Sequence, residues 1–248
     1  MLRSFYTAGT GMLTQRDRME VLTNNLTNAD TTGYKADTLV LSNFRSMMIE
    51  RLNDPDAGSS RTVGPLGTGA HINRVYTSFE QGNLEETGRN LDFALEGPGF
   101  FVLSTPEGER YTRDGSFSLT SDGYLISGSG MYVQGSNGRI FVGGDDFAVD
   151  EQGGVYIGGV LTDRIRIVSF ADNDSLRKDE NNMYQATQGA AADTATKVYQ
   201  GRLEGSNVDV AGELANMLSV SRAYDTNQRV LRMIDGTLDK AVNEVGRV

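Results

Sequence analysis

Residues 214–245, LANMLSVSRAYDTNQRVLRMIDGTLDKAVNEV, contain the pattern that decides the fold. Hydrophobic side chains recur there every three or four residues, which makes one face of a helix apolar along its length. Seven of the ten positions in this register are apolar. The ten positions are Leu214, Met217, Ser221, Tyr224, Gln228, Leu231, Asp235, Leu238, Val242 and Val245. Because Asp209 and its neighbours supply oxygens that can cap a helix, we predict a helix over 211–246.

The N-terminal segment repeats this pattern. Its three-to-four spacing runs through Leu2, Phe5, Gly9, Met12, Arg16, Met19, Thr23 and Leu26, and five of these eight are apolar. We predict a helix over 3–28, which ends at the turn residues 28–33. Both stripes are wider than a two-stranded seam requires, so we expect the helices to pack together and to bury their remaining apolar surface against other copies of the chain. A helical hairpin that closes onto the middle of the same molecule is the alternative.

The middle of the chain changes to a period of two residues. Short strands are predicted at 100–103, 116–119, 124–126, 131–133, 139–142, 155–157 and 164–168, separated by turn dipeptides such as Asp114-Gly115 and Asp122-Gly123. The predicted fold class is therefore α+β, with terminal helices that form a coiled-coil core layer and an inserted antiparallel β domain. We expect a helical core of 1–35 and 205–248, an extended connector over 36–75 and a β-rich outer domain over 76–204.

The composition argues against most catalytic chemistry. The 248 residues include no cysteine and one histidine, His71, so disulfides, thiolate chemistry and multi-histidine metal sites are excluded. The run that begins at Asp172 lacks the glycine and the glutamate of a calcium loop, because Arg177 and Met183 occupy those positions. We therefore predict no catalytic residue, no metal and no cofactor. A rival hypothesis is a cell-wall hydrolase that uses a carboxylate, but no motif in the sequence supports it.

The charge is concentrated in the middle. The formal net charge is −10, and residues 36–200 account for it because both ends are nearly neutral. This excludes the cationic footprint of a nucleic-acid-binding protein. No stretch approaches the roughly 18 apolar residues of a membrane span, and residues 1–22 lack the apolar region of a signal peptide. We expect no membrane insertion. We expect the chain to be exported without a cleaved signal peptide.

Several motifs resemble one family when they are taken in chain order. They are Leu22–Lys35 (LTNNLTNADTTGYK), Gln81–Leu84 (QGNL), Asp92–Phe101 (DFALEGPGFF), Tyr111–Phe117 (YTRDGSF), Glu204–Val210 (EGSNVDV) and Leu214–Met217 (LANM). Together they are similar to the signatures of the bacterial flagellar rod and hook proteins, and they extend over nearly the whole chain. One departure is Gly212, which stands where the family often has an acidic residue that completes a capping box, with Glu213 one step late.

The resemblance implies a structural subunit of the flagellar basal-body rod, proximal or distal, which assembles into a helical tubular drive shaft that transmits torque from motor to hook. It also implies that the partners are copies of the chain, other rod and hook proteins and the flagellar type III export apparatus, and that the location is the basal body in the cell envelope. A hook-type or other axial protein, or a β-domain binding module whose helices pair with a different partner, is the alternative. The expected subunit-packing residues are Leu2, Phe5, Met12, Met19, Leu26, Asn24, Asn25, Asn28, Gly33, Tyr34, Leu214, Met217, Tyr224, Leu231, Leu238, Val242 and Val245.

Overall fold

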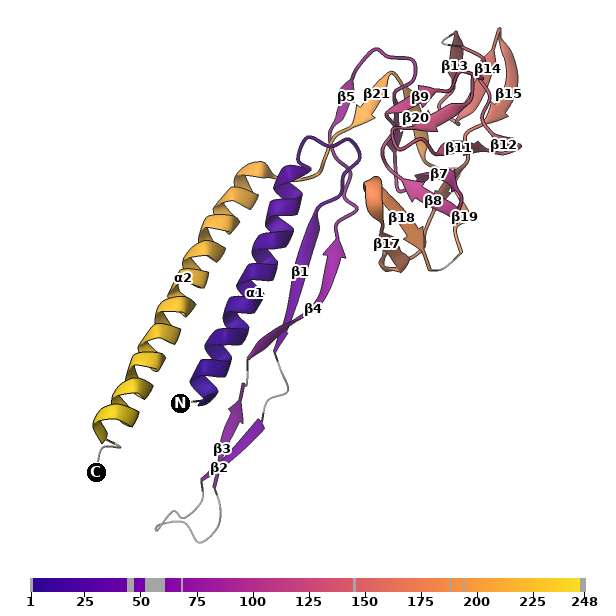
Figure 1. Ribbon diagram of the computed structural model, residues 1–248. Helices are drawn as coiled ribbons and strands as arrows, with labels where there is room; N and C mark the ends of the chain where they lie inside the picture. The colour runs from indigo at the N-terminus through magenta and orange to yellow at the C-terminus, as the bar shows by residue number, and fades with distance from the viewer. Residues whose placement is uncertain are drawn as a thin grey trace. The chain divides into compact units, whose positions relative to one another are not determined.

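The structure is a computed structural model that describes residues 2–43, 47–51, 61–67, 69–144, 146–187, 189–193 and 195–245. It is α+β, with a helix near each end and a β-rich middle, as predicted (Figure 1). The chain divides into two compact units. The helical unit comprises 1–26, 37–77 and 209–248, and the β unit comprises 27–36 and 78–208.

Both predicted helices are confirmed. Helix α1 spans Leu2–Thr27, and α2 spans Val210–Lys240, with one turn of π-helix, η3 (Ala241–Val245), after it. Asp209 occupies the cap position of α2, but its side chain makes no capping hydrogen bond there. A Cβ atom at Gly212 would lie 2.5 Å from the Asp209 carboxylate, so the departure from the capping box leaves room for that side chain.

The segment expected to be an extended connector is paired with itself inside the helical unit. Strand β1 (Asp37–Asn43) pairs antiparallel with β4 (Ala70–Thr77), and β2 (Met47–Arg51) pairs antiparallel with β3 (Arg61–Leu66). A register shift interrupts each ribbon, between Val40 and Leu41 in the first and between Ile49 and Glu50 in the second. Pairing satisfies backbone groups that an unpaired extended chain would leave to water.

The β unit is built from short antiparallel strands. Among the described residues its largest sheet has ten strands, of which seven follow the order β17-β18-β8-β7-β11-β10-β9. The strands of this sheet are β7 (Phe100–Thr105), β8 (Gly108–Thr112), β9 (Phe117–Leu119), β10 (Leu125–Ser127), β11 (Tyr132–Gly135), β12 (Gly138–Arg139), β16 (Ile167–Ser169), β17 (Leu176–Lys178), β18 (Met183–Ala186) and β19 (Ala191–Ala192). The smaller sheets combine β13 (Phe147–Val149), β14 (Gly154–Ile157) and β15 (Val160–Arg164), then β6 (Phe93–Glu96) with β20 (Lys197–Gln200), and β5 (Leu84–Glu86) with β21 (Arg202–Glu204). Two 3-10 turns, η1 (Asn173–Ser175) and η2 (Glu180–Asn182), flank β17.

Six of the seven predicted strands are found with altered bounds, whereas the one expected at 164–168 is divided between the end of β15 and the start of β16. The strands expected at 100–103 and 155–157 are β7 and β14, whereas the one expected at 139–142 shortens to β12. The shortening has a local cause, since the Ile140 N–H still donates to the Val133 carbonyl of β11, but the Val142 N–H donates to the Gly123 carbonyl instead. Strand periodicity persists in the sequence there although the regular ladder has ended.

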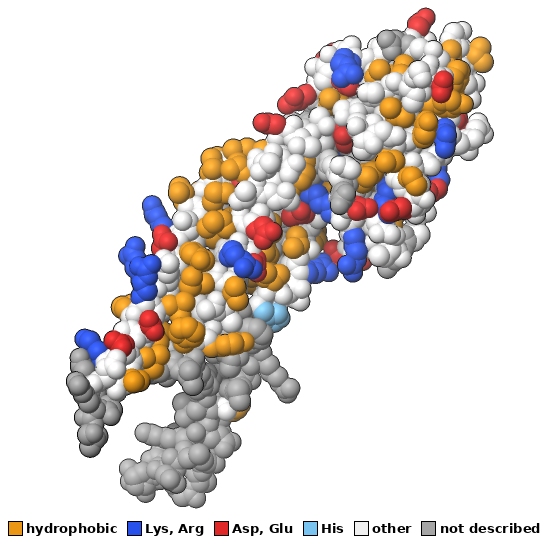
Figure 2. Space-filling view, viewed as in Figure 1, with side chains coloured by type: hydrophobic (Ala, Val, Ile, Leu, Met, Phe, Trp, Pro, Cys, Tyr) orange, Lys and Arg blue, Asp and Glu red, His pale blue; other side chains and the backbone are white. Residues whose placement is uncertain are grey.

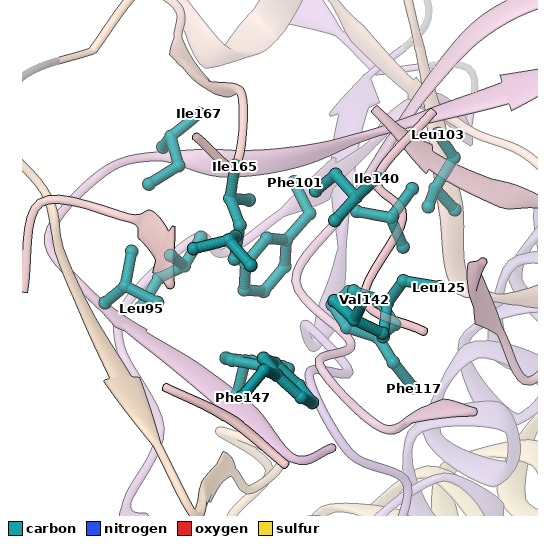
Figure 3. Close-up of a cluster of buried hydrophobic side chains, with 14 of the residues drawn as sticks. Leu95, Phe101, Leu103, Phe117, Leu125, Ile140, Val142, Phe147, Ile165 and Ile167 are labelled. Atoms are coloured by element: carbon teal, nitrogen blue, oxygen red, sulfur yellow. The ribbon is translucent and has the colours of Figure 1, made fainter. Parts of the chain in front are cut away.

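The core of the β unit is a cluster of aliphatic and aromatic side chains contributed by different strands (Figure 3). Phe101 and Phe117 meet edge to face, with ring centroids 5.1 Å apart, and Phe93 stacks at a tilt beside Phe117. A second cluster around Phe100, Tyr111 and Tyr184 lies on the other side of β7. Each such buried side chain contributes about 1.5–3 kcal/mol through loss of contact with water.

Candidate assembly surface

The two helices touch at two places that fix their relative direction. The side-chain amide of Asn25 donates to Glu213 Oε1 over 3.3 Å, and a Cβ atom on Gly11 would lie 3.1 Å from the Asn227 amide. Fourteen residues separate the two contact points on each helix, since 25 − 11 and 227 − 213 are equal. The helices are therefore antiparallel and keep the same register between these points.

Large hydrophobic side chains on this pair remain exposed. They are Phe5, Tyr6 and Leu13 on α1 and Val210, Leu214, Leu218, Met233 and Val242 on α2. The β1–β4 ribbon adds Val40, Leu41, Val75 and Tyr76 to the exposed apolar surface of the helical unit. Figure 2 shows hydrophobic side chains at the surface on the visible face. A monomer gains no burial energy from the exposed parts of these side chains.

Part of the exposed surface is hollowed. A groove of about 460 Å³ lies along α1 between Phe5 and Arg16, and Tyr224 of α2 forms part of its wall. Its other lining residues are Tyr6, Gly9, Thr10, Met12 and Leu13. The lining is dominated by apolar atoms, so the groove suits an apolar helix face better than a charged ligand.

Asn25 attaches the start of β1 to the end of α1. Its side chain is fully buried, and its amide donates to the Asp37 carbonyl over 2.8 Å while its oxygen accepts from the Asp37 N–H over 2.9 Å. Asn25 therefore bonds to Asp37 through both a donor and an acceptor, as a neighbouring strand would. An aspartate could supply the acceptor but not the donor. This explains chemically why an asparagine stands at this position of the N-terminal motif.

The charged residues of three motifs meet in the interior of the β unit. Lys35 Nζ lies 2.6 Å from Glu204 Oε1, and Arg113 Nη1 lies 3.4 Å from Glu204 Oε2. We call these three residues the ion junction. All three are buried, and each also bonds to backbone: Lys35 to the Glu80 carbonyl, Arg113 to the Gly97 carbonyl and Glu204 to the Gly82 N–H. Their partners come from segments that are far apart in the chain.

Burial shapes the electrostatics of the ion junction. Loss of hydration lowers the pKa of the Lys35 ammonium, and the attraction of Glu204 offsets this only in part. Burial likewise lowers the pKa of the Arg113 guanidinium against the pull of the same carboxylate. Arg113 also packs over the Phe100 ring at 4.8 Å. Both cations therefore depend on Glu204, because the interior offers them little hydration.

The remaining motif residues fasten the turn at 31–36 to the β unit. Asn207 accepts from the Ala36 N–H over 2.7 Å and donates to the carbonyls of Ser78 and Glu80. The Gly33 N–H donates to the Glu204 carbonyl over 2.7 Å, and the buried Tyr34 ring lies 3.7 Å below Lys178 Nζ. Separate motifs in the sequence therefore converge at one buried place.

The structure places the expected packing residues in three environments. Asn25, Gly33 and Tyr34 are buried and make contacts inside the chain, whereas Phe5, Leu214 and Val242 are exposed; Asn24 is also exposed. Met12, Met19, Leu26, Asn28, Met217, Tyr224, Leu231 and Leu238 are half-buried. The side chains of Leu2 and Val245 lie outside the described residues. On α2 the buried residue is Val220, next to Ser221 of the expected register.

Sequence reasoning assigned no role to Lys35, Arg113 or Glu204, although all three lie inside the quoted motifs. The available signal was a charged residue within two positions of a glycine or an aromatic residue in each motif. In the described part of the chain, no group of His, Cys, Asp and Glu is placed to hold a metal ion, and no helix is long and apolar enough to cross a membrane.

This fold and site define a class: an α+β structural protein with a helix near each end of the chain, an antiparallel β insertion between them and apolar helix faces left exposed. Three family models match it: "Flagella basal body rod protein" over residues 5–35, "Flagellar hook protein FlgE/F/G D1 domain" over 94–157 and "Flagellar basal body rod FlgEFG protein C-terminal" over 199–244. The matched ranges include Lys35 and Glu204 of the ion junction, and also Arg113.

Relatives match along the full length. The flagellar hook-basal body complex protein FlhO of Bacillus subtilis is 32% identical over 100% of both chains. The flagellar basal-body rod protein FlgG of Buchnera aphidicola is 33% identical over 97% of this chain and 98% of the relative, and FlgF of Caulobacter vibrioides is 31% identical over 100% of both. The chain belongs to the family of flagellar basal-body rod proteins; it is a structural rod subunit and not an enzyme.

Replacing Glu204 tests the ion junction. We expect Glu204→Gln to lower the free energy of unfolding of the β unit by about 3–5 kcal/mol, because it leaves two buried cations without their anion. Guanidinium denaturation of the full chain, followed by near-ultraviolet circular dichroism of its tyrosines, measures this. The matched control is Glu151→Gln, which removes an ion pair of 3.0 Å to Lys197 whose side chains are both about half exposed; its cost should stay below about 1 kcal/mol. Equal effects of the two substitutions would contradict this account of the junction.

Gly33 tests the close approach beside the junction. Gly33 and Gly88 have similar positive φ angles, 64° and 70°. A Cβ atom at Gly33 would collide with the Arg113 backbone, whereas a Cβ atom at Gly88 would have no other atom within 4 Å. Gly88→Ala should cost about 1–2 kcal/mol of stability from its backbone conformation. Gly33→Ala should cost a further 1–3 kcal/mol, roughly, from the steric clash. Thermal unfolding of the two variants measures the difference, and indistinguishable midpoints would refute the steric argument.

Proposed function

We propose that copies of this chain polymerise through the exposed apolar faces of α1 and α2 into the helical tubular drive shaft that transmits torque from motor to hook. In this proposal the terminal helices form a coiled-coil inner layer and the β unit faces outward. The observation that carries the proposal is the set of large apolar side chains that the antiparallel helix pair leaves in water. Removal of such a surface from water drives association.

The energies of burial and association indicate that a whole helix face, and not a single pair of side chains, holds two copies together. Burying one large apolar side chain is worth about 1.5–3 kcal/mol, whereas association costs roughly 4–15 kcal/mol in lost freedom of motion. One pair of side chains is too weak to hold two copies together. The exposed parts of Phe5, Tyr6 and Leu13 on α1, together with those of Leu214 and Leu218 on α2, offer a burial energy of the same order as that cost when both copies contribute.

The half-buried positions of α2 support a coiled-coil seam. Met217, Tyr224 and Leu231 are half-buried and follow the expected heptad register, and the buried Val220 lies on the same side. Side chains spaced in this way pack between those of a neighbouring helix. The apolar residues among the expected packing residues of both helices are accordingly proposed to contact neighbouring subunits through the parts that remain exposed beside the α1–α2 contact.

The acidic middle of the chain suits an outward position. Its negative charge keeps neighbouring β units from clumping, while the nearly neutral ends come together without strong repulsion. We further propose that the neighbours along the shaft include other rod and hook proteins, and that the chain reaches the basal body in the cell envelope through the flagellar type III export apparatus without a cleaved signal peptide. Relatives named as basal-body rod proteins support this location. Their full-length similarity does not favour a binding module with an unrelated partner.

A charge placed on the helix face tests the proposal. Leu214→Glu should abolish polymerisation of the purified chain, because a carboxylate would have to be dehydrated in the apolar contact. The control is Leu161→Glu on β15, since Leu161 is exposed to nearly the same degree, 51% against 45% for Leu214. Sedimentation velocity over a range of concentrations, with electron microscopy of the products, measures both. Polymers formed equally by the two variants, or by neither the variants nor the unmodified chain, would overturn the proposal.

A further inference from the structure

Helix α2 is longer than its partner in the same molecule. The register set by Asn25 with Glu213 and Gly11 with Asn227 places Leu2, the first described residue of α1, level with Gly236. The nine residues 237–245 of α2 and η3 lie beyond that level. At 1.5 Å per residue they extend roughly 13 Å past the start of α1. Figure 1 shows this extension at the C-terminal end of α2. We call residues 237–245 the overhang.

The overhang continues the face of α2 that meets α1. Val220, Tyr224 and Asn227 lie on that face, and steps of three and four residues extend it through Leu231 and Ile234 to Leu238 and Ala241. Next to it stands Val242, which is 69% exposed. The overhang therefore carries a surface that is apolar like the helix contact beside it, but α1 does not extend along it in the described residues.

The groove between Phe5 and Arg16 offers a matching surface. It extends over residues 5–16 of α1, eleven helical steps or roughly 17 Å, which accommodates an overhang of roughly 13 Å. It is also lined by the aromatic and aliphatic side chains that receive a helix with apolar residues at three- and four-residue spacing. The same molecule cannot fill its own groove, because the overhang points away from it along the axis of a continuous helix.

Charge adds complementarity to shape. Arg16 and Asp17 lie at the Arg16 end of the groove, and their exposed carboxylate–guanidinium contact links neighbouring residues. The overhang carries Asp239 and Lys240 on its exposed side. Each of these four charges therefore has a counterpart of opposite sign on the other surface. Exposed pairs of this kind contribute little energy, but they favour one orientation of docking.

We propose that the overhang of one copy docks into the Phe5–Arg16 groove of a second copy. This inference rests on the proposed self-assembly and specifies one of its contacts. The two surfaces are different and lie apart on one molecule, so the contact is head to tail. A head-to-tail contact that does not close generates an open helical chain, as a rod requires.

Disulfide trapping tests the contact cleanly, because the chain has no cysteine of its own. Val242→Cys on one copy is mixed with Leu13→Cys on another and oxidised under conditions in which the chain polymerises. The control mixture replaces Leu13→Cys with Leu161→Cys, which is similarly exposed but lies on β15. We expect the 242–13 dimer to form at least tenfold faster than the 242–161 dimer. Circular dichroism confirms that each variant keeps its helices.

The possible results of the trapping experiment distinguish failure of the head-to-tail contact from failure of the proposed self-assembly. Polymers in which residue 242 joins residue 13 no faster than residue 161, or in which 242 joins 242 of another copy instead, would contradict the head-to-tail contact while self-assembly stands. Trapping of residue 242 to a different protein in intact basal bodies, with none to residue 13, would contradict it as well. Failure of the unmodified chain to polymerise would overturn both.

Discussion

One buried carboxylate organises the junction between distant parts of this chain. Glu204 holds Lys35 from the segment after α1 and Arg113 from the β unit, and its own backbone carbonyl accepts from the Gly33 N–H. A buried carboxylate is costly unless it is paired and fully hydrogen-bonded, and here its partners are fixed by the fold around them. The segment before α2 and the segment after α1 are thereby joined in one cluster within the β unit.

The polar and apolar motif residues consequently have different roles. Asn25, Gly33 and Tyr34 were expected to pack subunits together, yet each makes specific contacts within its own chain. The apolar residues of the helix faces, such as Phe5 and Leu218, stay exposed. In the proposed assembly, hydrogen bonds and ion pairs define the subunit, and the exposed hydrophobic area is left for neighbouring copies.

Much of the fold was predictable because its signals are local. The helix stripes and the turn dipeptides follow from periods of 3.6 and 2 residues, and both helices were placed within a few residues of their bounds. The strands β1 and β4 were expected only as extended chain, because their pairing depends on contacts between residues far apart in sequence. The ion junction was not predicted for the same reason. Lys35 and Glu204 are 169 residues apart, and no local sequence pattern indicates their contact.

Hydrogen exchange of individual backbone amides in the full chain tests the central claim most directly. The amides of Gly33 and Gly82 donate to Glu204, one to its carbonyl and the other to its carboxylate. If the ion junction unites the β unit, both amides will exchange as slowly as those of the core strand β7, through the same global opening. Exchange of both at the rate of exposed turns, while β7 stays protected, would show that the fold does not depend on this carboxylate.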